Sequence, residues 1–219
     1  MRLSRHGLAL LAAAIWLLPT ADGHSQGTIV YYQPDPALNY AGVPFPPYNN
    51  RELDINQDGV IDFAVRADPA FSTIAIFNNN RLASLPEDPP DIGAFVFPFA
   101  VGSQIGSSLN PVLVWERAGD YPGDSLLVGN FGTGSAIGLW PGVNAYVGIE
   151  LEISGQPHYG WIHIASDSFS SGSILDWAYE TRAGVAILAG AVPEPSCVSL
   201  CVLGILVLFA RRSQRRRQL

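Results

Sequence analysis

Residues 54–62 carry the pattern in this chain that is best suited to chemistry. They read Asp-Ile-Asn-Gln-Asp-Gly-Val-Ile-Asp, so oxygen-bearing side chains stand at positions 1, 3, 5 and 9 of the segment. When such a loop curls, alternate side chains converge, and a glycine at position 6 allows the sharp turn. Ca²⁺ prefers about six to eight oxygen ligands of this kind. We therefore predict a structural calcium site with side-chain ligands Asp54, Asn56, Asp58 and Asp62 and the carbonyl of Val60.

The residues that follow and flank this acidic loop (residues 54–62) indicate which class of calcium-binding loop it resembles. Position 12 of an EF-hand loop is a glutamate, whereas this chain has Val65 there, and no helical pattern flanks the segment. The acidic loop resembles the shorter calcium loops set between β-strands, as in FG-GAP repeats, rather than an EF-hand or a dockerin. The resemblance implies an ion that orders the loop. A metal-free turn rich in Asp, Asn and Gly is the alternative.

The C-terminal 28 residues, 192–219, consist of three parts in a fixed order. Val192, Pro193, Glu194, Pro195 and Ser196 come first, residues 196–210 are apolar, and residues 211–219 contain five arginines. The two prolines keep their segment extended and outside a following helix. A 15-residue helix spans about 22 Å, less than the ~30 Å bilayer core, and flanking arginines can snorkel. We expect a short transmembrane helix whose basic end is cytoplasmic. A buried helix with a basic tail is the alternative, although the run lacks a polar face.

This three-part order resembles the PEP-CTERM sorting signal of bacterial surface and exopolysaccharide-associated proteins. The resemblance implies that an exosortase recognises residues 192–196 and removes the tail. The Tyr159-Gly160-Trp161 and Asp176-Trp177 segments, followed by a small-residue segment, are also similar to the C-terminal halves of such proteins. The expected path is therefore export, brief anchoring in the membrane through the C-terminal helix, and delivery to the cell surface or the extracellular space.

Residues 1–23 form the pattern of a secretory signal peptide. Two arginines, at positions 2 and 5, precede an apolar run at 7–18, and small residues at 21 and 23 fit a cleavage site after Gly23. An amphipathic helix is the alternative, although residues 7–18 have no polar face. The exported domain is then residues 24–191, and its length suits a single domain with a sizeable core.

The charge of the exported part excludes some partners. Residues 24–192 contain five arginines, no lysine and 17 acids, which gives a net charge of −12. Nucleic acids and anionic membrane surfaces repel such a protein, so we expect no nucleic-acid partner. The two cysteines, Cys197 and Cys201, lie in the apolar tail. The domain therefore cannot use disulfides and must be stabilised by its core, to which the predicted metal ion would add.

The pattern of the exported domain predicts an all-β fold. Short β-branched and aromatic runs alternate with Gly, Pro, Asn and Asp, as in an antiparallel β-sandwich or jelly roll. The clearest hairpin joins 145–153 to 159–165 through residues 154–158, and the proline-rich segments 34–50 and 85–91 are expected to be irregular loops. The predicted strands are 28–33, 61–66, 71–78, 95–99, 112–116, 125–128, 136–140, 145–153, 159–165, 173–179 and 185–188.

The domain contains no recognisable catalytic motif. Gly-x-Ser-x-Gly, His-Glu-x-x-His and glycine-rich phosphate loops are absent. A glycosidase pair could come from the acids Glu116, Asp120, Asp124, Glu150 and Glu152. Of these, Glu150 and Glu152 share a strand face, which could equally be a solvated face. Four tryptophans could stack on sugars, although core packing is the more common role of a strand tryptophan. We expect a protein that is not an enzyme. A carbohydrate-binding module for exopolysaccharide is the main alternative, and a secreted glycoside-active enzyme is a third.

Overall fold

The computed structural model describes residues 29–43, 49–86, 94–120, 124–130, 136–167 and 169–193. In these residues every regular element is a β-strand. The strands are β1 (Ile29–Tyr32), β2 (Leu38–Ala41), β3 (Asn49–Leu53), β4 (Phe63–Ala67), β5 (Phe71–Ile76), β6 (Arg81–Leu85), β7 (Phe95–Val96), β8 (Pro98–Phe99), β9 (Gln104–Ile105), β10 (Val114–Arg117), β11 (Ser125–Gly129), β12 (Ile137–Gly138), β13 (Asn144–Ile153), β14 (Gln156–Ser166), β15 (Ser171–Glu180) and β16 (Ile187–Leu188).

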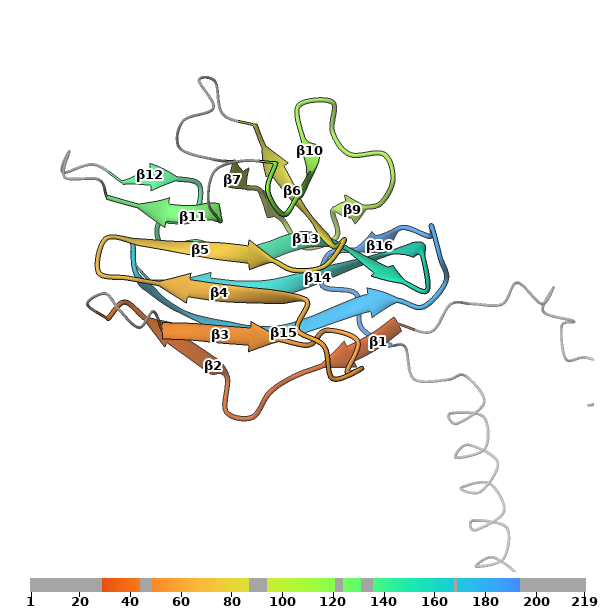
Figure 1. Cartoon of the computed structure of the whole chain (residues 1–219), viewed down its shortest axis with the longest axis horizontal. Coiled ribbons are helices and arrows are strands. Elements are labelled where there is room, and N and C mark those ends of the chain that lie inside the picture. Colours follow the sequence, from red (N-terminus) through yellow and green to blue (C-terminus); the bar gives the residue numbers. More distant parts are fainter. Residues whose placement is uncertain are drawn as a thin grey trace, which may run out of the picture.

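Fourteen of the described strands belong to one continuous sheet. Its main order is β1-β15-β14-β13-β6-β7-β11-β5-β4-β3, while β9 and β16 form a separate pair. In Figure 1, β3, β4, β5 and β11 lie in front of β13, β14 and β15, an arrangement consistent with a β-sandwich. The all-β prediction is confirmed. The sheet is not wholly antiparallel, however, because β7 pairs with β11 in parallel.

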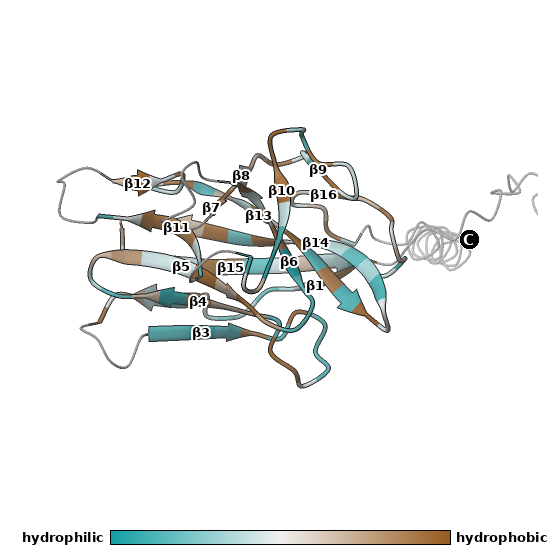
Figure 2. Ribbon diagram, turned by 45° about the horizontal axis from the view of Figure 1, so that its top comes forward, coloured by the Kyte–Doolittle hydropathy of each residue, from teal (hydrophilic) through white to brown (hydrophobic). Residues whose placement is uncertain are grey.

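The main hydrophobic core is assembled from strands far apart in the sequence. Phe63 on β4, Ile74 on β5 and Leu127 on β11 belong to one buried cluster with Ile149 on β13 and Ile162 on β14. Figure 2 shows the corresponding contrast between β11, which is mostly hydrophobic, and β3, which is hydrophilic. The hydrophilic strand stands at the end of the sheet order, where fewer neighbours bury it.

A second buried cluster involves the other face of the long strands. Trp161 and Ile162 are adjacent on β14, so they point to opposite faces, and they belong to different clusters. Ile105 of β9 and Ile187 of β16 belong to the same cluster as Trp161. The pair β9–β16 therefore contributes to the apolar cover of this face. Strand β14 is consequently buried on both faces along most of its length.

The β13–β14 hairpin is tighter than the sequence predicted. Ser154 and Gly155 both have positive φ, 54° and 73°, which suits a two-residue turn whose twist matches the strands. Gln156 then pairs with Ile153, and the pairing continues without interruption along both strands. The expected connection 154–158 is therefore wrong for its last three residues, which belong to β14.

The proline-rich segment 34–50 is not wholly irregular. It contains β2, which pairs with β15, and the start of β3, which pairs with β4. The two prolines at positions 34 and 36 precede β2, so they remove no donor from its ladder. β2 does alternate, with Leu38 and Tyr40 on its more buried face, but only over four residues. β3 is polar along most of its length, and its pairing with β4 places it in the sheet.

Several predicted segments fall outside the described residues. These are the signal peptide 1–23, the last three residues of the motif (194–196), the transmembrane helix 196–210 and the basic tail 211–219. Within the described residues there is no helix long and apolar enough to cross a membrane.

Glu116 is a buried acid on β10. Its exposed fraction is 3%, and it lies opposite Leu82 of β6. Burial raises the pKa of Glu116, and the neighbouring hydroxyls of Ser125 and Ser84 lower it by a smaller amount. The ionised carboxylate is therefore less favourable in the folded chain than in the unfolded one.

Replacing this acid gives a testable pH dependence. Below the ordinary glutamate pKa of 4.5, Glu116 is protonated in both the folded and the unfolded state, and its contribution to stability is fully present. That contribution is lost as the pH rises through the raised pKa of the folded state. The loss is about 1.4 kcal/mol for each unit by which the folded pKa exceeds the unfolded pKa. Glu116→Gln should therefore stabilise the domain at pH 7 and lose this advantage near pH 4. Denaturant unfolding across this range measures it, and a difference independent of pH would contradict the explanation.

Candidate metal centre

The acidic loop leaves and re-enters the sheet at neighbouring positions. It follows Leu53, the last residue of β3, and leads to Phe63, the first residue of β4, and these two residues are paired. The Asp62 N–H donates to the Leu53 carbonyl at 2.9 Å and closes the loop at its base. Figure 1 shows the loop connecting these two adjacent strands. The ends are thus held by the sheet, and the intervening residues curl between them.

Side-chain oxygens at the first, third and fifth positions accept hydrogen bonds from the loop's own backbone. Asp54 accepts from the N–H groups of Asp58 at 3.1 Å and Gly59 at 2.8 Å. Asn56 Oδ1 accepts from Asp58 N–H at 3.1 Å, and Asp58 Oδ1 accepts from Val60 N–H at 2.8 Å. Gly59 has φ +87°, a conformation that side chains rarely adopt. The curl that the spacing predicted is therefore present.

Asp62 occupies a different environment from the other acids of the loop. Only 5% of it is exposed. Its Oδ2 accepts from the Ile55 N–H at 2.8 Å, and its Oδ1 accepts from Asn80 Nδ2 at 2.8 Å. Asn80 in turn accepts from the Glu152 N–H on β13 at 2.9 Å. Asp62 thus ties the start of the loop, through Asn80, to the β5–β6 connection and to β13.

Sequence reasoning did not identify Asn80 as part of this site. Asn80 is 2% exposed and lies 18 residues after Asp62. Asn80 ends a run of three asparagines, a pattern that predicts a turn. This pattern does not indicate which residue the Asn80 side chain bonds to. The contact depends on the antiparallel β4–β5 pair, which brings the end of β5 back to the beginning of β4.

The pKa of Asp62, the most buried acid of the loop, is raised. Burial is the main cause of the raised pKa of Asp62, and the charges of Asp58 and Asp54 raise it further. The hydrogen bonds from Ile55 and Asn80 act in the opposite direction. Among the described residues the Arg–acid pairs lie elsewhere, at Asp124, Glu150 and Glu180. A divalent cation would relieve this mutual repulsion.

The ligand types fit Ca²⁺, although the side chains are not already gathered around one position. A carboxylate or amide oxygen that accepts one N–H keeps a second lone pair, so Asp54, Asn56 and Asp58 retain acceptor capacity. No group of three His, Cys, Asp or Glu side chains in the described residues forms a ready-made metal site. The Asn56 Nδ2 donates to Asp58 Oδ2 at 3.0 Å. Binding an ion between these two side chains would replace that hydrogen bond.

The two glutamates that share a face of β13 differ in environment. Glu150 is 7% exposed and pairs with Arg81, with 3.0 Å between Nη1 and Oε1. Glu152 is exposed and accepts from Asn79 Nδ2 at 3.0 Å. The interpretation of both as a solvated face is therefore wrong for Glu150. This acid lies in a polar network at the edge of the second cluster.

The tryptophans of the domain are mostly core residues, as expected. Trp140, Trp161 and Trp177 are 0%, 1% and 5% exposed. The Nε1–H of Trp140 donates to the Val96 carbonyl at 2.8 Å inside the core. Trp115 on β10 is the exception among the four, because its ring is only partly buried and packs against the second cluster.

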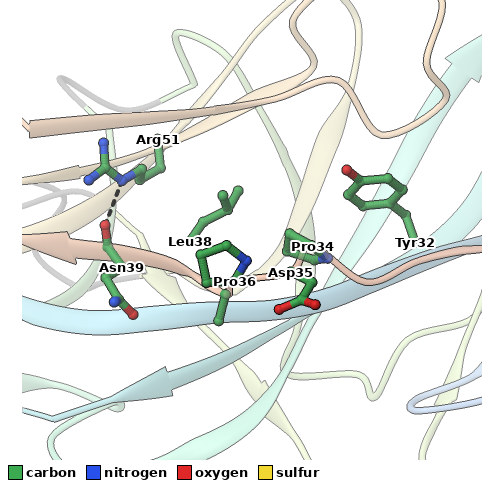
Figure 3. A pocket seen from close by; sticks show the side chains of 8 residues that line it. Tyr32, Pro34, Asp35, Pro36, Leu38, Asn39 and Arg51 are labelled. Atoms are coloured by element: carbon green, nitrogen blue, oxygen red, sulfur yellow. Dashed lines mark hydrogen bonds between the residues drawn. The ribbon is translucent and has the colours of Figure 1, made fainter.

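A shallow groove of about 440 Å³ lies beside β1, β2 and β3. Figure 3 shows Tyr32 at one end and Arg51 at the other, with Pro34, Pro36 and Leu38 between them. The Nε–H of Arg51 donates to the Asn39 carbonyl, and the Tyr32 ring packs on Trp177 with centroids 4.6 Å apart. The middle of this groove is mainly proline and leucine, and its aromatic and cationic groups lie at opposite ends.

The predicted sorting motif, residues 192–196, is described only at its start. Val192 and Pro193 follow the last strand, β16, and Val192 is 48% exposed. Comparison with known proteins adds no assignment, because no protein-family model, no curated protein and no solved structure matches this chain.

Proposed function

We propose that this chain is an exported protein without enzymatic activity that is sorted by an exosortase to the cell surface or extracellular matrix. Its domain is a β-sandwich stabilised by Ca²⁺ in the acidic loop. The observation that carries the sorting proposal is the order of residues 192–219: a Pro-Glu-Pro motif, a short apolar run and five arginines. Before processing, the apolar run anchors the protein in the membrane, and the exosortase is its processing partner.

The position of the motif relative to the domain supports this proposal. The last strand, Ile187–Leu188, pairs with β9, and Val192 follows within a few residues with about half of its surface exposed. An enzyme that binds an extended peptide needs a segment outside the hydrogen-bonded sheet. Proline at positions 193 and 195 removes two donors and disfavours continuation of a strand.

The composition of the domain supports the proposals that it is exported and that a bound cation stabilises it. Residues 24–192 contain no cysteine and have a net charge of −12. The domain therefore relies on its two hydrophobic clusters, and its acidic groups repel one another at neutral pH. A cation bound by the folded state alone stabilises it by mass action.

The proposal predicts the two ends of the mature protein. In the native host, the protein recovered from the cell surface or the medium should begin within about two residues of position 24, as the small-residue rule for signal peptides indicates. It should end within or next to residues 192–196 and lack the five arginines of the tail. Intact mass combined with terminal peptide mapping measures both ends. Recovery of a surface protein that retains residues 211–219 would contradict the proposal.

The carbohydrate-binding alternative is favoured by one observation. The partly exposed Trp115 lines a cleft together with Glu150, Glu152 and Arg81. The same two carboxylates are the pair that a glycoside-active enzyme would use, so hydrolysis must be measured separately from binding.

A further inference from the structure

A cleft of about 350 Å³ opens where β6, β10, β13 and the start of β14 meet. We call it the Trp115 cleft. It is separate from the acidic loop and from the sorting motif, and its lining includes aromatic, acidic, basic and amide side chains. The lining residues that matter for recognition are Arg81, Trp115, Glu150, Glu152, Gln156 and Tyr159.

The register of the sheet places four of the polar groups in one row. Arg117 of β10 lies opposite Arg81 of β6, Arg81 lies opposite Glu150 of β13, and Glu150 lies opposite Tyr159 of β14. Residues directly opposite one another in neighbouring strands point to the same face. Trp115 is two residues before Arg117 on β10, so it shares this face. The cleft is therefore built on four strands and needs no loop to bring its groups together.

The floor of the cleft is a buried, charge-paired network. Arg81 Nη1 lies 3.0 Å from Glu150 Oε1, and 9% of the Glu150 side chain is exposed. Burial raises the pKa of Glu150, while hydrogen bonding to Tyr159 and the charge of Arg117 lower it. A buried carboxylate held by several donors has a fixed position, so it can accept hydrogen bonds from a ligand without further ordering.

The aromatic wall of the cleft is also held in place. The Trp115 ring lies 5.6 Å from the Tyr159 ring, with an interplanar angle of 30°. Its Nε1–H donates to the Gly106 carbonyl at 3.3 Å. The remaining surface of the indole faces solvent in part, unlike the rings of Trp140, Trp161 and Trp177. A rigid, partly exposed aromatic ring is a surface on which an apolar ligand face can stack.

These groups match the chemistry of a sugar ring. A hexopyranose has an apolar face that stacks on an aromatic ring and a rim of hydroxyls that both donate and accept hydrogen bonds. Carboxylates at positions 150 and 152 supply acceptors, while Arg81 and Gln156 supply donors. Anionic sugars are disfavoured by the carboxylates and by the net charge of −12. Arg81 pairs with Glu150, so the cleft does not present two free carboxylates to a cation.

We propose that the Trp115 cleft binds a neutral hexopyranose chain, with one sugar ring stacked on Trp115 and its hydroxyls bonded to Glu150, Glu152 and Gln156. This inference goes beyond export and sorting and is independent of the acidic loop. A recognition site on the rigid sheet would let a displayed protein adhere to a neutral polysaccharide of its surroundings.

Calorimetric titration of the full chain tests the proposal. The protein is kept in a polyoxyethylene detergent, because sugar-headed detergents would compete. Cellohexaose, maltohexaose and mannohexaose serve as neutral probes, and hexagalacturonate serves as the anionic control. At least one neutral probe should bind at millimolar concentration or below, and hexagalacturonate should not. Trp115→Ala should weaken that binding at least about tenfold, equivalent to about 1.4 kcal/mol.

Two further variants locate the site. Tyr32→Ala removes the exposed ring of the other groove and should change the affinity less than about twofold, within ordinary measurement scatter. Gln156→Ala alters an exposed residue, so it keeps the test valid if Trp115→Ala fails to fold, and it should weaken binding about threefold or more.

The outcomes separate this inference from the proposed function. The cleft proposal would be overturned if none of the three neutral probes bound. It would also be overturned if Tyr32→Ala abolished the binding while Trp115→Ala left it intact. Preference for hexagalacturonate would overturn it as well. Release of reducing ends would support sugar binding in the cleft and would contradict the non-enzymatic role.

Discussion

Residues 24–192 should melt about 5–10 °C higher in excess Ca²⁺ than in a chelator. A ligand that binds only the folded state contributes about 2.7 kcal/mol at a hundredfold excess over its Kd. For a domain of this size each kcal/mol shifts the midpoint by about 2–4 °C. The physical source of the effect is the acidic loop, where Asp54, Asp58 and Asp62 repel one another and no described arginine pairs with them. Calorimetric or circular-dichroism melting in the two buffers measures it.

Two controls connect this shift to the loop. Asp58→Ala removes a central ligand and should abolish the difference between the buffers. Asp120→Ala removes another turn aspartate, whose Oδ2 accepts from the Arg117 N–H at 2.7 Å, and should leave the difference intact. Mg²⁺ should give a smaller shift, because it keeps its waters and demands stricter geometry. Equal midpoints for the unaltered domain in Ca²⁺ and in chelator would refute the calcium site.

Much of the fold could be predicted from local pattern. The alternating residues of β13 and β14 identified the hairpin that forms the middle of the long-stranded layer. Each of the eleven predicted runs overlaps at least one described strand. Four described strands, β2, β3, β6 and β9, were missed, and for β3 and β6 the physical reason is clear. Asn49–Leu53 is polar along most of its length, and Arg81–Leu85 is short and directly follows three asparagines. Their places come from pairing with β4, β10 and β13, which no local pattern reveals.

In the candidate sites too, the local contacts could be predicted from the sequence and the contacts between distant strands could not. The acidic loop is local, so the spacing of Asp54, Asn56 and Asp58 predicted its curl correctly. The hydrogen bond from Asn80 to Asp62 and the pairing of Arg81 with Glu150 join residues separated by 18 and 69 positions in the sequence. These contacts depend on sheet register, and a single sequence does not reveal register between distant strands. The burial of Glu150 was unforeseen for the same reason.

Among the proposed features, the sorting signal at residues 192–219 has the largest expected effect on the fate of the protein in its host. Replacing Pro193, Glu194 and Pro195 together by alanine removes both fixed prolines and the acid, and lets the preceding segment join a helix or strand. The exosortase should then lose its substrate, and the uncut protein should remain in the membrane fraction with its arginine tail. A matched variant with Pro89, Pro90 and Asp91 replaced by alanine changes two prolines and one acid within the domain. It should still be cut and delivered.

The most direct test of the account is therefore the mass and location of these two variants beside the unaltered protein in the native host. We predict a shortened chain at the cell surface or in the medium for the unaltered protein and the matched variant. For the variant with Pro193, Glu194 and Pro195 replaced by alanine, we predict an uncut chain that keeps its C-terminal arginines and stays in the membrane fraction. Identical processing and delivery of all three proteins would contradict the assignment of residues 192–219 as a sorting signal.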